Sequence, residues 1–227
     1  MLPLRDNVPT RTRPWITYAL LLANVLVWVL YQLPDLQASV DELAYHPCEV
    51  VDECAQVGEG WLVTAFTSMF MHGGWEHLLG NMLFLWVFGN NVEDTLGHLR
   101  FLVFYVVGGF AATALQTAVT LSTASEAAAT IPNLGASGAV SAVLGAYLVL
   151  LPRAGVLTLI FFFILREVPA IVFLGLWFVF QLYSGGTAIQ QPPEGGGVAF
   201  FAHVGGFVFG AALVKLVAIR PPLQPRW

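Results

Sequence analysis

The sequence predicts an all-α membrane protein, a polytopic bundle of six transmembrane helices. Of its 227 residues, 57% are hydrophobic and only 10% are charged, whereas a soluble domain carries about 25% charged residues. Crossing a bilayer takes roughly 20 consecutive apolar residues, and the chain contains several runs of about that length. The positive charges also gather on one side of such a bundle, as described below.

The six predicted spans are apolar runs separated by charged or turn-forming segments. They cover approximately residues 15–33, 72–90, 100–120, 136–151, 169–184 and 198–218. We expect one membrane domain over residues 15–218, with short cytoplasmic tails at 1–14 and 219–227. No cleaved signal peptide and no soluble domain is expected, because the first apolar run is long and no small-residue cleavage site follows it.

The charge distribution predicts the orientation. With six spans, all nine Lys and Arg residues lie on the side of the N-terminus, and the opposite segments 34–71, 121–135 and 185–197 contain none. Positive residues favour the cytoplasmic side, so both termini are expected to be cytoplasmic. We expect a prokaryotic cell membrane, with the lipid bilayer as surroundings and no nucleic-acid partner.

Two apolar runs are too short to span a bilayer. Residues 61–71 are expected to form an interfacial helix on the outer side. Residues 156–165 are a similar case and are expected at the inner interface; the alternative is one continuous span over 156–184.

The outer loops contain two further features. Residues 184–197 are rich in Gly and Pro and could form a mobile cap that gates a buried site, or an ordinary connection. Cys48 and Cys54 lie in the first outer loop, where they could form a short disulfide or remain two free thiols.

Polar residues inside three of the spans predict a functional site, because such groups are costly in hydrocarbon. Span 2 contains His77 and Asn81, which share a helix face because they are four residues apart. Span 4 contains Ser137 and span 6 contains His203. A helix rise of about 1.5 Å per residue places Asn81, Ser137 and His203 roughly 2–9 Å below the outer boundary. A hydroxyl, an imidazole and an amide are therefore expected in one layer.

Small residues recur at four-residue intervals on spans 4 and 6. Such spacing lets two membrane helices approach closely, which would bring Ser137 and His203 together. The alternative is that these glycines reflect the general abundance of Gly in membrane helices. The residues expected to support the pair in this way are Gly138, Ser141, Gly145, Gly206 and Gly210.

These residue types suit nucleophilic catalysis. A serine hydroxyl needs a neighbouring base, usually His, to take its proton, and the oxyanion that forms needs hydrogen-bond donors. The Asn81 amide, a His77 N–H and the backbone at the start of span 4 could donate. Spans 4 and 6 contain no Asp or Glu that could orient His203. A Ser–His dyad is therefore expected in place of a triad.

Three segments together resemble the rhomboid family of intramembrane proteases: HGGWEHLLGN (72–81), GASG (135–138) and AHVGGFVFG (202–210). The resemblance implies a rhomboid-like fold and serine endopeptidase activity on transmembrane protein substrates. It implies Ser137 as nucleophile, His203 as base, and His77 and Asn81 in the oxyanion hole, with no cofactor and no metal.

One departure of the chain from the family concerns the surroundings of His203. Some members carry an aromatic residue four positions after the nucleophile, where it stacks on the catalytic His, but here that position is Ser141. We therefore expect another contact, such as Phe207 or a hydrogen bond, to orient His203.

Other functions compete with this interpretation. One is a catalytically inactive relative that binds membrane clients. Another is a metal-dependent membrane enzyme using His72, His77 and His203, although the zinc motif H-E-x-x-H is absent.

Overall fold

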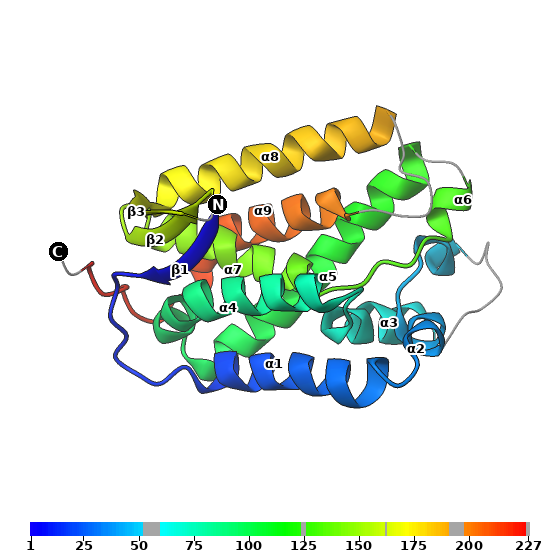
Figure 1. Ribbon diagram of the computed structural model, residues 1–227, viewed down its shortest axis with the longest axis horizontal. Coiled ribbons are helices and arrows are strands. Elements are labelled where there is room, and N and C mark those ends of the chain that lie inside the picture. The colour runs from blue at the N-terminus through cyan, green and yellow to red at the C-terminus, as the bar shows by residue number, and fades with distance from the viewer. Residues whose placement is uncertain (52–59, 124–125, 162, 191–197, 226–227) are drawn as a thin grey trace.

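The computed structural model describes residues 1–225 except 52–59, 124–125, 162 and 191–197. The chain forms a mostly helical bundle, 70% helix, with a small sheet at one end (Figure 1). The elements are β1 (Leu2–Asp6), α1 (Trp15–Leu26), η1 (Val27–Gln32), α2 (Leu36–Leu43), η2 (Pro47–Val51), α3 (Trp61–Thr67), η3 (Ser68–Phe70), α4 (Trp75–Leu96), α5 (His98–Thr123), α6 (Glu126–Ala129), α7 (Ser137–Leu150), β2 (Gly155–Ile160), β3 (Ile164–Pro169), α8 (Ala170–Gln190) and α9 (Phe200–Val217).

Every predicted span coincides with a helix, so the predicted membrane helix bundle is confirmed. Within the described residues, four helices are long and apolar enough to cross a bilayer: Trp15–Gln32, His98–Thr123, Ala170–Ile189 and Phe200–Val217. The span predicted at 72–90 is the 22-residue α4, which has acidic residues in its last turns.

The fourth span, α7, is shorter than expected. It has 14 residues, which corresponds to about 21 Å of helix. Every residue from Gly138 to Tyr147 is buried. The helix is therefore enclosed by protein, and its first residue can lie below the membrane surface.

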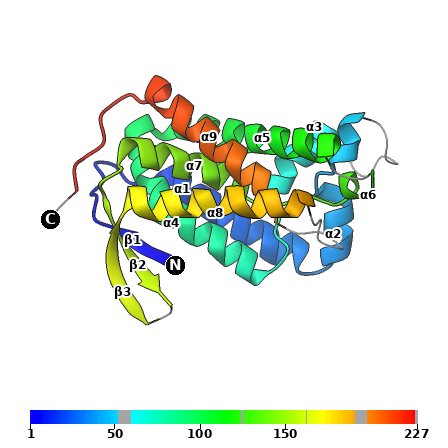
Figure 2. The same ribbon diagram turned by 90° about the horizontal axis from the view of Figure 1, so that it is seen from above.

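The helices are arranged around α7 and α9. In Figure 1, α8 lies along one edge and α1 along the opposite edge, with α4, α7 and α9 between them. The short helices α2, α3 and α6 lie at one end of the bundle, and the sheet lies at the other, near both chain ends. Figure 2 shows the same separation from above.

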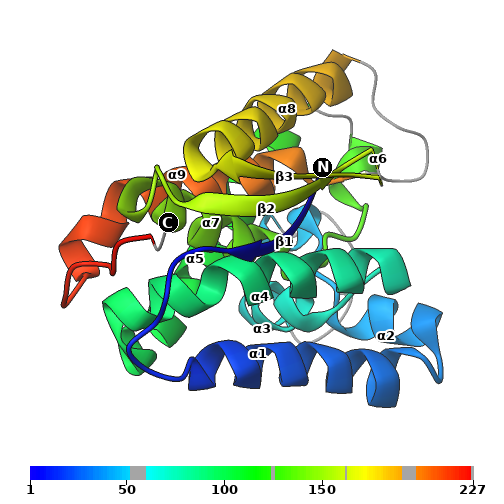
Figure 3. The same cartoon turned by 60° about the vertical axis from the view of Figure 1, so that its left-hand side comes forward.

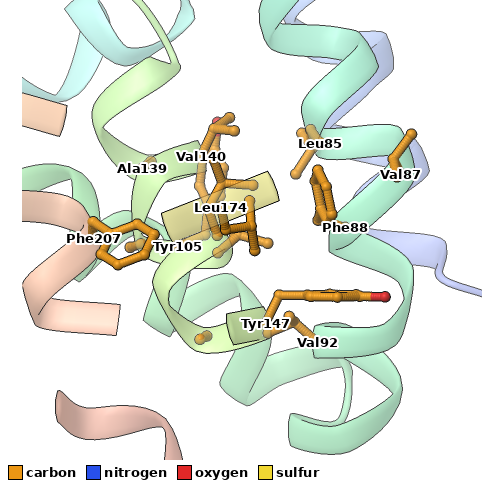
Figure 4. Packing of buried hydrophobic residues seen from close by; sticks show 14 of the residues in the cluster. Leu85, Val87, Phe88, Val92, Tyr105, Ala139, Val140, Tyr147, Leu174 and Phe207 are labelled. Carbon is orange, nitrogen blue, oxygen red and sulfur yellow. The ribbon is translucent and has the colours of Figure 1, made fainter. Parts of the chain in front are cut away.

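Aromatic and aliphatic side chains fill the space between α4 and α7 (Figure 4). Phe88 contacts Tyr147 edge-to-face with ring centroids 4.9 Å apart, which is a favourable arrangement for aromatic pairs. Leu85 and Val140 belong to the same buried cluster. This packing holds α7 against α4, which carries the predicted oxyanion-hole residues.

The segment expected at the inner interface, residues 156–165, belongs in its described residues mainly to the strands β2 and β3, and it is not part of a continuous span. β2 pairs antiparallel with β3 and also with β1, in which Leu2 lies opposite Leu159 and Asp6 opposite Val156 (Figure 3). Val156 and Thr158 are buried, in a run rich in the branched and aromatic residues that suit strands. The N-terminal segment expected as a tail thus contributes a strand to the fold.

The outer segments agree only in part with the predictions. Residues 61–70 form α3 and η3, so the predicted helix is confirmed. The helix α8 continues to Gln190, through residues 184–190 that were expected to be loop. The remainder of that loop, 191–197, and Cys54 lie outside the described residues, so the cap and the disulfide stay predictions; Cys48 is buried.

Candidate active site

Ser137 and His203 lie within hydrogen-bond distance of each other. Ser137 is the first residue of α7, and His203 lies in the first turn of α9. The distance from Ser137 Oγ to His203 Nε2 is 2.8 Å. A base nitrogen at this distance can accept the hydroxyl proton.

Glycines make the approach of α7 and α9 possible. A Cβ added to Gly206 would lie 2.1 Å from the carbonyl oxygen of Gly138, and one added to Gly210 would lie 1.9 Å from that of Ala142. Both positions leave no room for a methyl group next to backbone atoms. The two helices therefore pack backbone to backbone directly after the serine and the histidine.

Gly145 of α7 behaves in the same way, whereas a Cβ added to Gly138 would lie 2.7 Å from the Ala112 side chain of α5. A Cβ added to Gly145 would lie 2.0 Å from the carbonyl oxygen of Phe207. Ser141 is buried, and its hydroxyl donates a 2.6 Å hydrogen bond to the carbonyl of Ser137 on its own helix. Ser141 thus places a small side chain, with its hydroxyl already hydrogen-bonded, at the position where some relatives have an aromatic ring.

The partner of the second His203 nitrogen comes from α8. His203 Nδ1 lies 2.8 Å from Gln181 Oε1, and Gln181 is buried. The ring beside His203 is Trp177, with centroids 5.8 Å apart, whereas Phe207 stacks on Phe178 at 4.5 Å. The predicted hydrogen bond to His203 thus exists, but the sequence did not identify Gln181, which stands there as an isolated amide in span 5.

The imidazole of His77 has one nitrogen committed to the protein. The backbone N–H of Gly73 donates to His77 Nδ1 at 3.3 Å. In a neutral imidazole one nitrogen accepts and the other carries the proton, so Nε2 is the donor. That N–H is available to a group bound next to His77.

Asn81 brings a second donor from one turn further along α4. Its amide nitrogen is buried and has no hydrogen-bond partner among the described residues. Unpaired buried donors are rare in proteins and call for an explanation. A ligand oxygen that accepts this N–H would provide one.

Gly135 connects these donors to the serine. Its φ of +131° lies in a region that L side chains rarely adopt. A Cβ there would lie 2.7 Å from His77 Nε2 and 3.5 Å from Ser137 Oγ. The loop before Ser137 therefore passes close to the His77 ring, and only glycine fits there.

A cavity of about 1030 Å³ brings the predicted residues together. Ser137, His203, His77 and Asn81 all line it, as does Trp177. The site thus combines polar groups from α4, α7 and α9 with an aromatic wall from α8. A cavity of this size can hold several residues of a peptide.

His72 lies behind the site and does not line this cavity. Its side chain is fully buried, its ring centroid is 5.1 Å from that of His77, and its backbone N–H donates to Gln32. In the described part of the chain, no three His, Cys, Asp or Glu residues gather as metal ligands would. The set His72, His77 and His203 therefore does not form such a group.

Gln116 is a second residue that the sequence did not identify. Its Oε1 accepts hydrogen bonds from the backbone N–H groups of Phe201 and Ala202, at 3.1 and 3.2 Å. Both donors lie at the start of α9, where backbone N–H groups have no partner in the preceding helical turn, and the N–H of Ala202 is shared with the carbonyl of Ala199. The amide from α5 thus caps the turn that carries His203.

The fold and the site together define a class of protein: polytopic membrane proteins with a Ser–His pair in a polar cavity between the helices. The sequence matches the Rhomboid domain family over residues 59–220. The chain belongs to the rhomboid family.

Curated relatives agree with this assignment. The chain is 29% identical over 195 residues to "Rhomboid protein 1, mitochondrial" of Saccharomyces cerevisiae, covering 86% of this chain and 51% of the relative. It is 33% identical over 166 residues to "RHOMBOID-like protein 4" of Arabidopsis thaliana, covering 72% and 35%. It is 32% identical over 136 residues to "Rhomboid protease GluP" of Bacillus subtilis, covering 60% and 24%.

The chain thus spans about half or less of the length of these relatives. They support an integral membrane protein. They do not support the expected prokaryotic cell membrane, because the yeast relative is mitochondrial by name.

Proposed function

We propose that this protein is an intramembrane serine endopeptidase that hydrolyses peptide bonds of transmembrane-helix substrates near the outer membrane face. The observation that carries the proposal is the 2.8 Å contact between Ser137 Oγ and His203 Nε2, inside a cavity that His77 and Asn81 also line. Membership of a family that includes a protein named as a protease supports the same function.

The first half of the reaction is acylation of Ser137. His203 Nε2 takes the hydroxyl proton while Oγ attacks the scissile carbonyl carbon. The negative charge that develops on the carbonyl oxygen is stabilised by the His77 Nε2–H and the Asn81 amide. The protonated His203 then gives its proton to the departing amine, which leaves an acyl-enzyme.

The second half is hydrolysis of that ester. A water molecule in the cavity gives a proton to His203 Nε2 and attacks the acyl carbon. The same donors stabilise the second oxyanion, and the proton returns to Ser137 Oγ as the carboxylic acid product leaves.

The substrate must expose a peptide bond that a membrane helix hides in its own hydrogen-bond ladder. Segments with Gly or Pro near the outer face unwind more easily and are the expected cleavage sites. With both termini on the cytoplasmic side, as the positive charges indicate, Ser137 opens toward the non-cytoplasmic half of the bilayer.

Cleavage of a model transmembrane substrate in proteoliposomes tests the proposal. Ser137→Ala and His203→Ala are each expected to abolish product formation, since one removes the nucleophile and the other its base. A fluorophosphonate probe, which reacts with activated serines, should label the wild type and not Ser137→Ala.

Ser122→Ala is the matched control, because Ser122 is an exposed α5 residue whose hydroxyl donates to the Val119 carbonyl of its own helix. It should cleave like the wild type. A wild type that binds the substrate without cleaving it would favour an inactive client-binding protein, and full activity of Ser137→Ala would refute the serine mechanism.

A further inference from the structure

We propose that Gln181 is a positioning residue that selects the catalytic tautomer of His203. The inference rests on the proposed function. It assigns to one amide of α8 the role that an acidic residue has in a catalytic triad and that an aromatic ring has in some relatives.

The contact has the geometry of a strong orienting bond. Gln181 Oε1 lies 2.8 Å from His203 Nδ1, opposite the 2.8 Å contact of Nε2 with Ser137 Oγ. The imidazole therefore lies between the amide and the hydroxyl. Both of its nitrogens have a partner, and rotation of the ring would break both contacts.

The chemistry of the amide oxygen sets the position of the proton. Because a carbonyl oxygen only accepts, Nδ1 must carry the hydrogen, and a neutral imidazole then has its lone pair on Nε2. That lone pair is what Ser137 needs from its base. The other tautomer would put a hydrogen on Nε2 and leave Ser137 without an acceptor.

Two neighbouring residues, Ser141 and Trp177, do not hydrogen-bond to the His203 ring. The position that could bring an aromatic ring from α7 is Ser141, whose hydroxyl is committed to the Ser137 carbonyl. Trp177 lies beside the His203 ring at a tilt of 36°, so it limits the ring's movement without bonding to a nitrogen. Gln181 is buried, and water competes poorly for a buried acceptor.

The bond also connects the dyad to a third helix. Ser137 and His203 belong to the tightly packed pair α7 and α9, whereas Gln181 belongs to α8, which lies along one edge of the bundle (Figure 1). The dyad is therefore complete only when α8 is in its packed position.

Two substitutions separate positioning from packing. Gln181→Met keeps the length of the side chain and removes the acceptor; Gln181→Glu keeps an acceptor at the same place. In triads, a wrong tautomer lowers kcat about 10⁴-fold, and for a neutral amide we expect a smaller loss, about 10- to 100-fold in kcat for Gln181→Met with little change in KM. Gln181→Glu should restore most of that loss.

Thr187→Val is the matched control on the same helix, because Thr187 is exposed and its hydroxyl bonds back to Ser184. It should retain wild-type kcat. Equal kcat for Gln181→Met and the wild type, or equal loss in Gln181→Met and Gln181→Glu, would overturn the role of the acceptor.

NMR of protein labelled at the histidine ring nitrogens gives a test that needs no turnover. The His203 signal, assigned by its loss in His203→Ala, should show a proton on Nδ1 and none on Nε2 in the wild type. A proton on Nε2 refutes the inference even if the enzyme cleaves. A wild type that cleaves nothing refutes the proposed function and leaves the tautomer result standing.

Discussion

Asn81 combines an unpaired buried donor with a place in the cavity lining. An unpaired buried donor costs about 1–3 kcal/mol, and Asn81 Nδ2 is such a donor in the described structure. Its neighbour His77 also directs a free N–H, on Nε2, because Gly73 occupies the other ring nitrogen. Both side chains line the cavity with Ser137, as expected if a substrate oxyanion completes their hydrogen bonds.

Replacement of Asn81 by Ala should therefore impair turnover more than folding. We expect kcat to fall about 10²-fold or more, the usual effect of removing one oxyanion donor. The melting temperature should stay within a few degrees, since the Asn81 amide nitrogen has no hydrogen bond to the described residues that could be lost. Kinetics and thermal unfolding of the same sample check both parts.

Asn90→Ala, on the same helix but outside the cavity lining, serves as the control and should keep wild-type kcat. Unchanged turnover in Asn81→Ala would remove this amide from the oxyanion hole.

Among the elements, the α7–α9 pair determines whether a dyad exists. Lipid tails are as apolar as the helices, so two membrane helices associate through close packing and interhelical contacts. Glycine allows that closeness at Gly206 and Gly210, where a Cβ would overlap backbone atoms. The catalytic distance therefore depends on the absence of methyl groups at these two positions and at Gly145.

A methyl group at Gly206 should separate the helices. We expect Gly206→Ala to lower the free energy of unfolding by about 1–3 kcal/mol, as overpacking does, and to abolish most cleavage. Gly175→Ala is the matched control because nothing lies within 4 Å of a Cβ there. Equal stability and activity of the two variants would contradict the packing argument.

At the scale of the whole molecule, contacts between the end of α4 and the N-terminal segment stabilise the end of the bundle opposite α2 and α3. Glu93 is fully buried and accepts hydrogen bonds from the backbone N–H groups of Ile16 and Thr17, which begin α1. Asp94 accepts from Arg11 and lies 3.8 Å from Arg220 near the C-terminal end. Glu93 and Asp94 of α4 thus bind segments near both ends of the chain.

Asp6 joins the sheet to this assembly. Its carboxylate accepts hydrogen bonds from the Tyr147 hydroxyl and the Asn91 amide. Burial raises the pKa of the Asp6 carboxyl above its ordinary value, and the hydrogen bonds from Tyr147, Val8 and Asn91 only partly oppose this. The folded protein therefore favours the protonated acid more than the unfolded chain does.

This linkage predicts a pH dependence of stability. Asp6 contributes fully to the free energy of unfolding at pH values below the pKa of an unfolded Asp, about 4. This contribution is lost as the pH rises through the higher pKa of the folded protein. Asp6→Asn removes the titrating group, so the melting temperature of the wild type should decrease more than that of the variant over this range. Parallel melting curves in detergent from pH 4 to pH 7 would argue against a raised pKa.

The membrane helix bundle and the closeness of Ser137 to His203 were predicted from the amino-acid sequence, because apolar length and small-residue spacing are patterns local to each segment. The partners that complete the site did not follow from it. Gln181 and Gln116 are isolated amides, and their roles depend on which atoms lie within hydrogen-bond distance of them. The strand β1 pairs with β2, which is about 150 residues away in the sequence. Contacts between segments so far apart are decided only when the helices pack, which is why the orientation of His203 and the sheet became visible in the tertiary structure alone.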